Sequence, residues 1–369
     1  MTERRISVLG ATGYTGRLIV QELRRRNLPL LAAARNPEKL RRLAAELPGI
    51  ETLVADVSDD AALAGLASRS RVLINTAGPF IDYGEPVVRA AIAQGAHYVD
   101  TTGEQPFIKA MLAHDEWARQ QGVAVVCAQA FEIAVSDCAA ALAAADFRED
   151  AAVQVTYVTR FHASRGTQRT VLRMLQSTGY AYVGGEWVEE APAKLVRFVD
   201  FPAPIGRVAA VSFPSAEVIT VPRHVAAREV RTFMALPPIA VRLLSATAPL
   251  LRLAIRSPLA AVAARCIGSG TGGPDAATRA RDEFRIAVDV RGVCQGRATQ
   301  RRVLVQGCDP YGLTAVIAAH GAVQLSDPAY ARAGVLAPAA AFDARQLLDA
   351  LGAFGVTYAI IDGLPGRSD

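Results

Sequence analysis

Near its N-terminus the chain reads Ile6-Ser7-Val8-Leu9-Gly10-Ala11-Thr12-Gly13-Tyr14-Thr15-Gly16. An apolar run meets three glycines spaced three residues apart, and a helical pattern follows at once. This arrangement is typical of the turn between the first strand and first helix of a dinucleotide-binding fold. We expect the turn to bind the cofactor through Gly10, Thr12, Gly13, Tyr14, Thr15 and Gly16. The alternative is a doubly wound domain that has lost its nucleotide.

Strand-like and helical patterns alternate through the first third of the chain. We predict strands over Ile6–Gly10, Leu28–Ala33, Glu51–Ala55, Val72–Asn75, Tyr98–Asp100 and Val123–Cys127. The predicted helices are Thr15–Arg26, Pro37–Glu46 with Asn36 as its N-cap, Glu85–Gln94 and Gln105–Gln121. This alternation predicts an α/β fold with a Rossmann-type doubly wound parallel sheet. Ligands of such sheets bind beyond the carboxyl ends of the strands.

Strand-like runs dominate the rest of the chain. They cover Val153–Phe161, Leu195–Val199, Val208–Phe213, Phe284–Val293, Thr299–Gln306 and Thr357–Ile361. Helical patterns cover Thr167–Ser177, Pro310–His320 and Asp343–Ala353, and a turn-rich passage covers Tyr180–Trp187. These patterns predict a second, α+β domain with a mixed or antiparallel sheet. A length of 369 residues fits two domains.

The end of the second predicted strand indicates which dinucleotide binds. In an NAD site an acidic residue usually holds the ribose 2′-hydroxyl there, whereas this strand ends in Ala34-Arg35. Arg35 can pair with a 2′-phosphate through two hydrogen bonds, and Lys39 lies one helical turn further on. These residues favour NADP(H), unless Arg35 is a solvated loop residue. Asp56, after the third strand, either borders the adenine or starts a helix.

Two further turns at strand ends carry polar or aromatic candidates. In the first turn, a Gly-Pro step can lay backbone against a nicotinamide ring, and the residues are Asn75, Ala77, Gly78, Pro79 and Phe80. Tyr83 then faces the substrate and can donate a hydrogen bond to an enolate or amine. In the second turn, Asp100 and Glu104 flank a glycine. We take Tyr83, Asp100 and Glu104 as catalytic candidates; the alternative is that both carboxylates only cap a helix.

These blocks resemble the saccharopine dehydrogenase-like oxidoreductases, including their branch of trans-acting enoyl reductases. The resemblance covers residues 5–140 and rests on Gly10–Gly16, Asn75–Phe80 with Tyr83–Val88, and Gly95–Asp100 with Gly103-Glu104. Weaker similarity lies at Gly307–Thr314 and Gly334–Pro338. The resemblance implies an NADP-binding domain over residues 1–135, with 335–369 packing back on it. It also implies a substrate and dimerisation domain over residues 136–334.

The chain departs from the family's pattern after the sixth predicted strand. Family members often read Gly-Phe-Asp-Ser-x-Pro-x-Asp, whereas this chain reads Ala130-Phe131-Glu132-Ile133-Ala134-Val135-Ser136-Asp137. Because this loop lines the substrate side in the family, we expect Phe131, Asp137, Phe80 and Tyr83 to contact substrate. The missing glycine, serine and proline predict an unusual substrate. The alternative for Asp137 is a charge near a helix N-terminus.

Residues 236–266 combine apolar blocks with arginines, and no acidic residue lies between Glu229 and Asp275. The pattern predicts two helices that are basic and apolar at once. Three interpretations remain open: a core helix pair or homodimer interface, a membrane-surface helix, or a docking face for an acyl chain on an acidic carrier protein.

Composition excludes several classes of protein. The net charge is +5, and no run of five or six basic residues suggests nucleic-acid binding. The five cysteines form no CxxC pair and no metal-ligand spacing, so we predict no metal and a reducing cytoplasm. A strand beginning by residue 6 leaves no room for a signal peptide, and no apolar run reaches the roughly 18 residues of a spanning helix.

We therefore expect an NADP-dependent oxidoreductase that transfers a hydride from NADPH to an enoyl or related apolar carbonyl substrate. The partner is a small-molecule or acyl substrate, and the location is cytoplasmic or peripheral to a membrane. The alternatives are an opine-type C–N reductase and a non-catalytic NADPH-binding protein. The Tyr-x-x-x-Lys pair of short-chain dehydrogenases is absent, since Leu18, Val87 and Thr102 follow Tyr14, Tyr83 and Tyr98 at that spacing.

Overall fold

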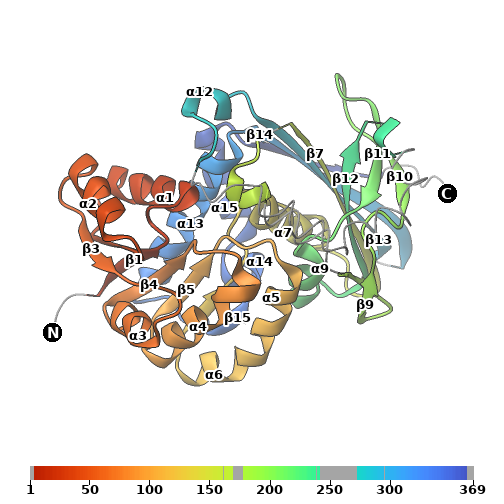
Figure 1. The fold of residues 1–369 in the computed structure, drawn as a ribbon. Helices are drawn as coiled ribbons and strands as arrows, with labels where there is room; N and C mark the ends of the chain where they lie inside the picture. Colours follow the sequence, from red (N-terminus) through yellow and green to blue (C-terminus); the bar gives the residue numbers. More distant parts are fainter. Residues whose placement is uncertain are drawn as a thin grey trace. The chain divides into compact units, whose positions relative to one another are not determined.

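The computed structural model describes residues 4–160, 162–168, 178–237, 239–241, 272–294 and 296–363 (Figure 1). The chain divides into two compact units. The first comprises Met1–Ala134, Thr271–Gly273 and Tyr311–Phe342, and the second comprises Val135–Gly270, Pro274–Pro310 and Asp343–Asp369. The predicted domain boundaries, residues 1–135 with 335–369 and residues 136–334, remain a prediction.

The first unit is built on a seven-stranded sheet of order β15-β6-β5-β4-β1-β2-β3. All neighbouring strands in this sheet run parallel. The strands are β1 (Arg5–Leu9), β2 (Leu30–Ala34), β3 (Glu51–Val54), β4 (Ser70–Asn75), β5 (His97–Asp100), β6 (Ala124–Val126) and β15 (Gly334–Leu336). The predicted Rossmann-type sheet is confirmed, and β15 extends it with a strand that the sequence pattern did not predict.

Helices cover both faces of this sheet (Figure 1). They are α1 (Tyr14–Arg25), α2 (Pro37–Glu46), α3 (Asp60–Ser68), α4 (Phe80–Ala93), α5 (Gln105–Met111), η1 (Leu112–His114), α6 (Asp115–Gln120), α13 (Pro310–Ser326) and α14 (Pro338–Ala341). On one face, apolar residues of α1 and small alanines of α13 share a core with Ile6 and Val8 of β1. The predicted cap of α2 is present, because the Asn36 side chain accepts the Lys39 N–H at 2.9 Å.

The second unit is built on a nine-stranded sheet whose main order is β10-β11-β12-β7-β13-β14-β16. Its strands are β7 (Ala151–Arg160), β8 (Gly179–Val183), β9 (Glu186–Glu190), β10 (Val196–Asp200), β11 (Arg207–Ser212), β12 (Ala227–Leu236), β13 (Glu283–Cys294), β14 (Arg297–Cys308) and β16 (Thr357–Asp362). Only β12 and β7 pair in parallel, so the predicted mixed sheet is confirmed. Its short helices are α9 (Glu217–Thr220), η2 (Val221–Arg223), α12 (Ala276–Arg279), α15 (Ala344–Leu351) and η3 (Gly352–Phe354).

Several predicted elements were wrong in type or extent. The loop predicted before Glu85 is already helical from Phe80, because Glu104 accepts the N–H groups of Phe80 and Ile81 and so caps α4 from a distant turn. The loop predicted after β6 is instead the start of α7 (Phe131–Ala143). The passage predicted as turn-rich around residue 184 is the β8–β9 hairpin, and β12 was missed.

One further predicted helix differs in extent, and two predicted segments fall mostly outside the described residues. The predicted helix Gln105–Gln121 is broken into α5, η1 and α6. Most of the predicted helix over 167–177 and most of the basic, apolar segment 236–266 lie outside the described residues.

Two glycines of the first unit, Gly84 and Gly65, allow a test of how its helices pack. Gly84 lies where α4 meets α5, and a Cβ there would collide with the Phe107 ring, which is 2% exposed. We predict that Gly84→Ala lowers the free energy of unfolding by roughly 1–3 kcal/mol through overpacking. The control is Gly65→Ala in α3, where a Cβ has open space. This substitution should raise the free energy of unfolding by about 0.5–1 kcal/mol. Urea unfolding followed by circular dichroism measures the stability of both variants. Equal stability would contradict the close packing of Phe107 against Gly84.

Candidate functional site

The strand order of the first sheet reverses between β1 and β4, and ligands of open α/β sheets bind at such a point. The turns that follow these two strands touch each other. Thr76 donates both its backbone N–H and its hydroxyl to the Leu9 carbonyl oxygen, at 2.9 and 2.8 Å. The two turns therefore form one continuous surface at the carboxyl edge of the sheet.

The glycine turn after β1 leaves no room for a side chain at Gly10 or at Gly16. Gly10 has a φ of +82°, and a Cβ there would lie 2.6 Å from the Thr76 hydroxyl. A Cβ on Gly16 would collide with the Gly10 carbonyl oxygen. The N-cap residue of helix α1 is Gly13, which makes no side-chain hydrogen bond to the first turn. That turn contains no acidic residue. A helix N-terminus of this kind fits a pyrophosphate, because its first N–H groups have no intrahelical acceptor.

The side chain of Tyr14 is fixed by packing within the first unit. The Tyr311 ring meets it edge-on, with ring centroids 5.0 Å apart. The backbone at Gly273 passes so close that a Cβ there would lie 2.6 Å from the Tyr14 ring. Neither neighbour was predicted, because both are distant in sequence and their only local signals are a glycine and an aromatic residue.

The exposed end of β2 carries the residues predicted for the 2′-phosphate. Arg35 and Lys39 are both exposed, and no described residue forms an ion pair with the Arg35 guanidinium. Asp56 accepts the Ser58 N–H at 3.0 Å and the Ser58 hydroxyl at 2.8 Å. These bonds, and more weakly the charge of Arg35, lower the pKa of Asp56. Asp56 thus forms the turn before α3 and also lies within electrostatic reach of Arg35.

Asn75 organises the turn after β4. Its side-chain oxygen accepts the Ala77 N–H at 2.9 Å, and its amide nitrogen donates to the Tyr98 hydroxyl at 3.2 Å. Pro79 then precedes α4 as its extended N-cap residue. The backbone of Ala77, Gly78 and Pro79 therefore lies beside the glycine turn.

The two carboxylates predicted as catalytic are both bound to backbone N–H groups. Asp100 is fully buried, and its Oδ1 accepts the N–H of Ala128 at 2.8 Å and of Thr102 at 3.1 Å. Burial raises the pKa of Asp100 to about 6, although these hydrogen bonds work in the opposite direction. Glu104 accepts the Phe80 N–H at 3.1 Å and the Ile81 N–H at 2.9 Å. Their catalytic role stays a prediction, and this geometry favours positioning of the turns.

The predicted substrate contacts differ in how open they are. Tyr83 is 44% exposed on the first turns of α4, beside Ile81 at 46%. Phe80 is buried with its ring centroid 5.9 Å from that of Phe107. Phe131 is also buried, and its N–H donates to the Thr314 hydroxyl at 3.1 Å. Within the first unit, Tyr83 is thus the predicted contact that presents an open side chain.

Asp137 belongs to the second unit. It is fully buried, accepts the Thr220 hydroxyl at 2.7 Å and lies 3.0 Å from the His224 Nε2. These contacts link α7 to α9 and the turn after it. A substrate contact of Asp137 stays a prediction, and its observed partners explain its place in the fold.

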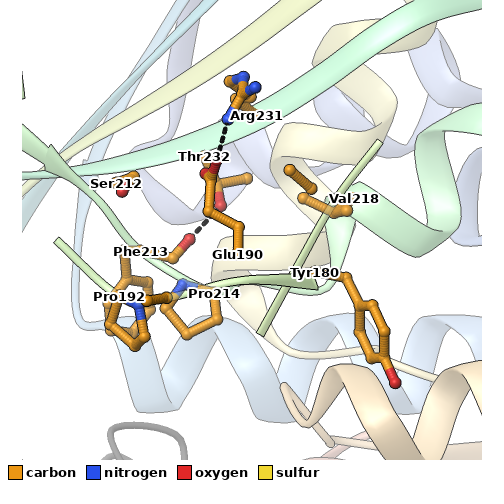
Figure 2. Close-up of a pocket in the computed structure, with 11 residues that line it drawn as sticks. Tyr180, Glu190, Pro192, Ser212, Phe213, Pro214, Val218, Arg231 and Thr232 are labelled. Carbon is orange, nitrogen blue, oxygen red and sulfur yellow. Dashed lines mark hydrogen bonds and ion pairs between the residues drawn. The ribbon is translucent and has the colours of Figure 1, made fainter. Parts of the chain in front are cut away.

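The second unit also contains a small pocket beside the β8–β9 hairpin (Figure 2). Arg231 forms ion pairs with Glu190 and, at 2.6 Å, with Glu229, so its charge is neutralised at the pocket wall. The cavity volume of about 10 Å³ is close to the space of one water molecule. Tyr180, Ser212, Pro214 and Val218 are among the other residues that line it. This pocket is too small for a cofactor or an acyl substrate.

Two further kinds of feature concern the part of the chain that the structure describes. This part contains no cluster of three or more His, Cys, Asp or Glu side chains arranged to bind a metal ion. It likewise contains no helix with the length and apolar character needed to cross a bilayer.

Comparison with known proteins gives a family match for the N-terminal part of the chain. Residues 6–158 match the family model described as the saccharopine dehydrogenase NADP binding domain. This match confirms the predicted family resemblance and the prediction of NADP(H) as the cofactor of this domain. The individual binding residues stay predictions.

Curated relatives match parts of the chain. A "Lipid droplet localized protein" of Caenorhabditis elegans is 29% identical over 216 residues, covering 53% of this chain and 51% of the relative. The human "Saccharopine dehydrogenase-like oxidoreductase" is 34% identical over 158 residues, covering 37% of each chain. A "Trans-acting enoyl reductase" of Mycobacterium ulcerans (strain Agy99) is 34% identical over 142 residues, covering 37% and 34%. The chain thus matches about half or less of the length of each of these relatives.

One solved structure shares the fold over almost the whole chain. The apo saccharopine dehydrogenase (L-Glu forming) of Saccharomyces cerevisiae aligns with a TM-score of 0.66 at 12% identity. The alignment covers 98% of this chain and 100% of the yeast chain. At this identity the likeness establishes the architecture alone.

Arg35 provides a test of cofactor choice. We predict that Arg35→Ala weakens NADPH binding at least tenfold, about 1.4 kcal/mol, and leaves NADH binding unchanged, because only NADPH carries the 2′-phosphate. The matched control is Arg41→Ala, an exposed arginine of α2 that pairs with Glu38. Titration calorimetry with both nucleotides measures the effect. An equal loss for NADH and NADPH would contradict the assignment.

Proposed function

Because residues 6–158 belong to the saccharopine dehydrogenase NADP binding domain family, we propose that the chain is an NADPH-dependent oxidoreductase. The observation that carries this proposal is the turn after β1, which has no room for a Cβ at Gly10 or Gly16 and is held against the turn after β4 by Thr76. An anion-binding helix end next to a second backbone turn suits a dinucleotide whose two halves lie on either side of the strand reversal.

The proposed contacts follow the carboxyl edge of the sheet. The pyrophosphate would lie against the glycine turn, bound by Gly10, Thr12, Gly13, Tyr14, Thr15 and Gly16. The 2′-phosphate would lie with Arg35 and Lys39, with Asp56 bordering the adenosine. The turn from Asn75 to Pro79 would flank the nicotinamide half. When bound, NADPH supplies a hydride to an electrophilic carbon.

For the substrate we propose an apolar enoyl or related carbonyl compound. Tyr83 and Ile81 give α4 an exposed surface with one hydroxyl donor and no charge of their own. A donor of this kind can stabilise the negative charge that develops on a carbonyl oxygen. Relatives from Mycobacterium ulcerans and Mycobacterium leprae carry the name trans-acting enoyl reductase, which favours the same chemistry. Asp100 and Glu104 would then hold the turns in place.

Turnover with two probes tests this proposal. We expect oxidation of NADPH by trans-2-dodecenoyl-N-acetylcysteamine and none by a mixture of 2-oxoglutarate and lysine. Tyr83→Phe should lower kcat about tenfold or more, since hydrogen-bond donors to a developing oxyanion typically contribute that much. The control is Tyr358→Phe on β16, a half-buried tyrosine whose hydroxyl donates to Asp349. Turnover with the 2-oxoglutarate and lysine mixture alone would instead establish an opine-type C–N reductase.

We also propose that residues 236–266 contact a membrane surface. The segment combines apolar blocks with arginines and lacks acidic residues, as interfacial helices do. The lipid droplet relative from Caenorhabditis elegans favours this alternative over a carrier-protein contact or a homodimer interface, which stay predictions.

Vesicle flotation tests the membrane proposal. The chain should float with vesicles that contain phosphatidylserine, and the triple variant Arg252→Glu, Arg256→Glu, Arg265→Glu should lose at least tenfold in binding, given about 1 kcal/mol per basic residue. The control variant replaces three exposed arginines elsewhere in the chain with glutamate: Arg41, Arg89 and Arg297. Equal flotation of the two triple variants would contradict the proposal.

A further inference from the structure

Glu132 lies at the carboxyl edge of the first sheet. It is the second residue of α7, and β6 ends six residues before it. Its carboxyl Oε1 lies 4.0 Å from the position that a Cβ on Gly103 would occupy, so the side chain rests on the turn after β5. The next residue of that turn, Glu104, holds the N-terminus of α4. Glu132 therefore borders the same set of turns as the Tyr83 helix.

Glu132 differs from the other carboxylates of this edge. Asp100 and Glu104 are bound to backbone N–H groups, as described above. Within the described part of the chain, no other residue forms an ion pair or hydrogen bond with the Glu132 carboxyl, which contacts only its own N–H. The residue is half-buried. A carboxyl group in this position is available to a ligand.

The segment that carries Glu132 is held in a strained conformation. Ala128 has a φ of +64°, in the left-handed region that residues other than glycine rarely adopt. Its N–H donates to Asp100, and the next N–H, that of Gln129, donates to the Asp100 carbonyl at 2.7 Å. Backbone strain of this kind persists where the surroundings fix it, and it is common at functional sites. Asp100 is thus a positioning residue for the start of α7.

Burial has the largest effect on the pKa of this side chain, and the hydrogen bond from its own N–H acts in the opposite direction. Burial raises the pKa of Glu132 to about 7, and no charged group contributes to the shift. The titratable groups on neighbouring elements are engaged elsewhere: Asp100 and Glu104 with backbone N–H groups, and Asp137 with Thr220 and His224. At neutral pH the carboxyl is therefore close to half protonated, which suits a proton donor.

The direction of the cofactor places its reactive half on the Glu132 side. Arg35 and Lys39 follow β2, so the adenosine half belongs to the β1–β2–β3 side of the strand reversal. A dinucleotide that crosses the reversal brings its nicotinamide half toward the strands β4, β5 and β6. Glu132 follows the last of these.

We propose that Glu132 is a catalytic residue that protonates the substrate after hydride transfer. This inference rests on the proposed function. The β-carbon of the enoyl group gains the hydride as its C=C bond opens, NADPH is oxidised to NADP⁺, and an enolate remains. The Glu132 O–H bond then breaks and its proton forms a C–H bond at the α-carbon. Solvent returns a proton to the Glu132 carboxylate.

Proton release on cofactor binding tests the position of Glu132 without any substrate. The nicotinamide ring is positively charged only in NADP⁺, and a positive charge nearby lowers the pKa of a carboxyl. Calorimetric titrations at pH 7 in buffers of different ionisation enthalpy should show NADP⁺ binding releasing roughly 0.4 proton more than NADPH binding, for a fall of about one pKa unit. The 2′-phosphate is common to both nucleotides and cancels.

Two variants make this measurement decisive. Glu132→Gln should abolish the difference in proton release between NADP⁺ and NADPH while both nucleotides still bind. Glu116→Gln, an exposed glutamate of α6 bonded to Gln120, should leave the difference unchanged. A difference that persists in Glu132→Gln would overturn the inference. Failure of the wild-type protein to bind either nucleotide would overturn the proposed function and, with it, this inference.

Turnover of trans-2-dodecenoyl-N-acetylcysteamine tests the proton transfer itself. Glu132→Gln should lower kcat by about 10²–10⁴-fold with little change in KM, and Glu132→Asp should restore part of kcat with a shifted pH profile. Unchanged kcat in Glu132→Gln would overturn the catalytic role. If the wild-type protein binds NADPH but reduces no enoyl probe, the proposed reaction and the proton transfer both fail, and proton release then reports only where Glu132 lies.

Discussion

The contact between Thr76 and the Leu9 carbonyl is the constraint on which the first unit depends. Thr76 donates two hydrogen bonds to one oxygen, and this brings the turn after β4 against the turn after β1. Side chains at Gly10 or Gly16 would collide with the Thr76 hydroxyl or the Gly10 carbonyl. The phosphate-binding turn is therefore shaped by close backbone packing, and its chemistry comes from the N–H groups that this packing leaves at the start of α1.

The carboxyl groups at this edge of the first sheet differ in what they contact. Asp100, through its Oδ1, and Glu104, through both carboxyl oxygens, accept backbone N–H groups and so fix three turns relative to one another. Glu132 rests on the turn that these two residues hold, and within the described residues its carboxyl bonds only its own N–H. Burial raises the pKa of both groups: that of Asp100 to about 6 against several hydrogen bonds, and that of Glu132 to about 7 against a hydrogen bond from its own N–H alone. A rigid shell around one unpaired acid is the arrangement that acid–base chemistry needs.

Local patterns in the sequence predicted the parts of the fold that local forces determine. The glycine turn, the Asn36 cap with Pro37 behind it and the alternation of strands with helices follow from neighbouring residues. The start of α4 at Phe80 depends on a carboxylate 24 residues away, which no local pattern reveals. Glu132 was missed for a similar reason: its lack of a partner is a property of the folded chain, and the only sequence signal was an acid in the block after β6. The Tyr14 neighbours Tyr311 and Gly273 are equally remote along the chain.

The most direct test of the central claim is a crystal structure of the protein grown with NADP⁺. The account predicts electron density for the pyrophosphate over the turn from Gly10 to Gly16, for the 2′-phosphate beside Arg35, and for the nicotinamide ring beside Glu132. Nucleotide bound away from the reversal between β1 and β4, or with its adenosine half on the β5–β6 side, would contradict the account.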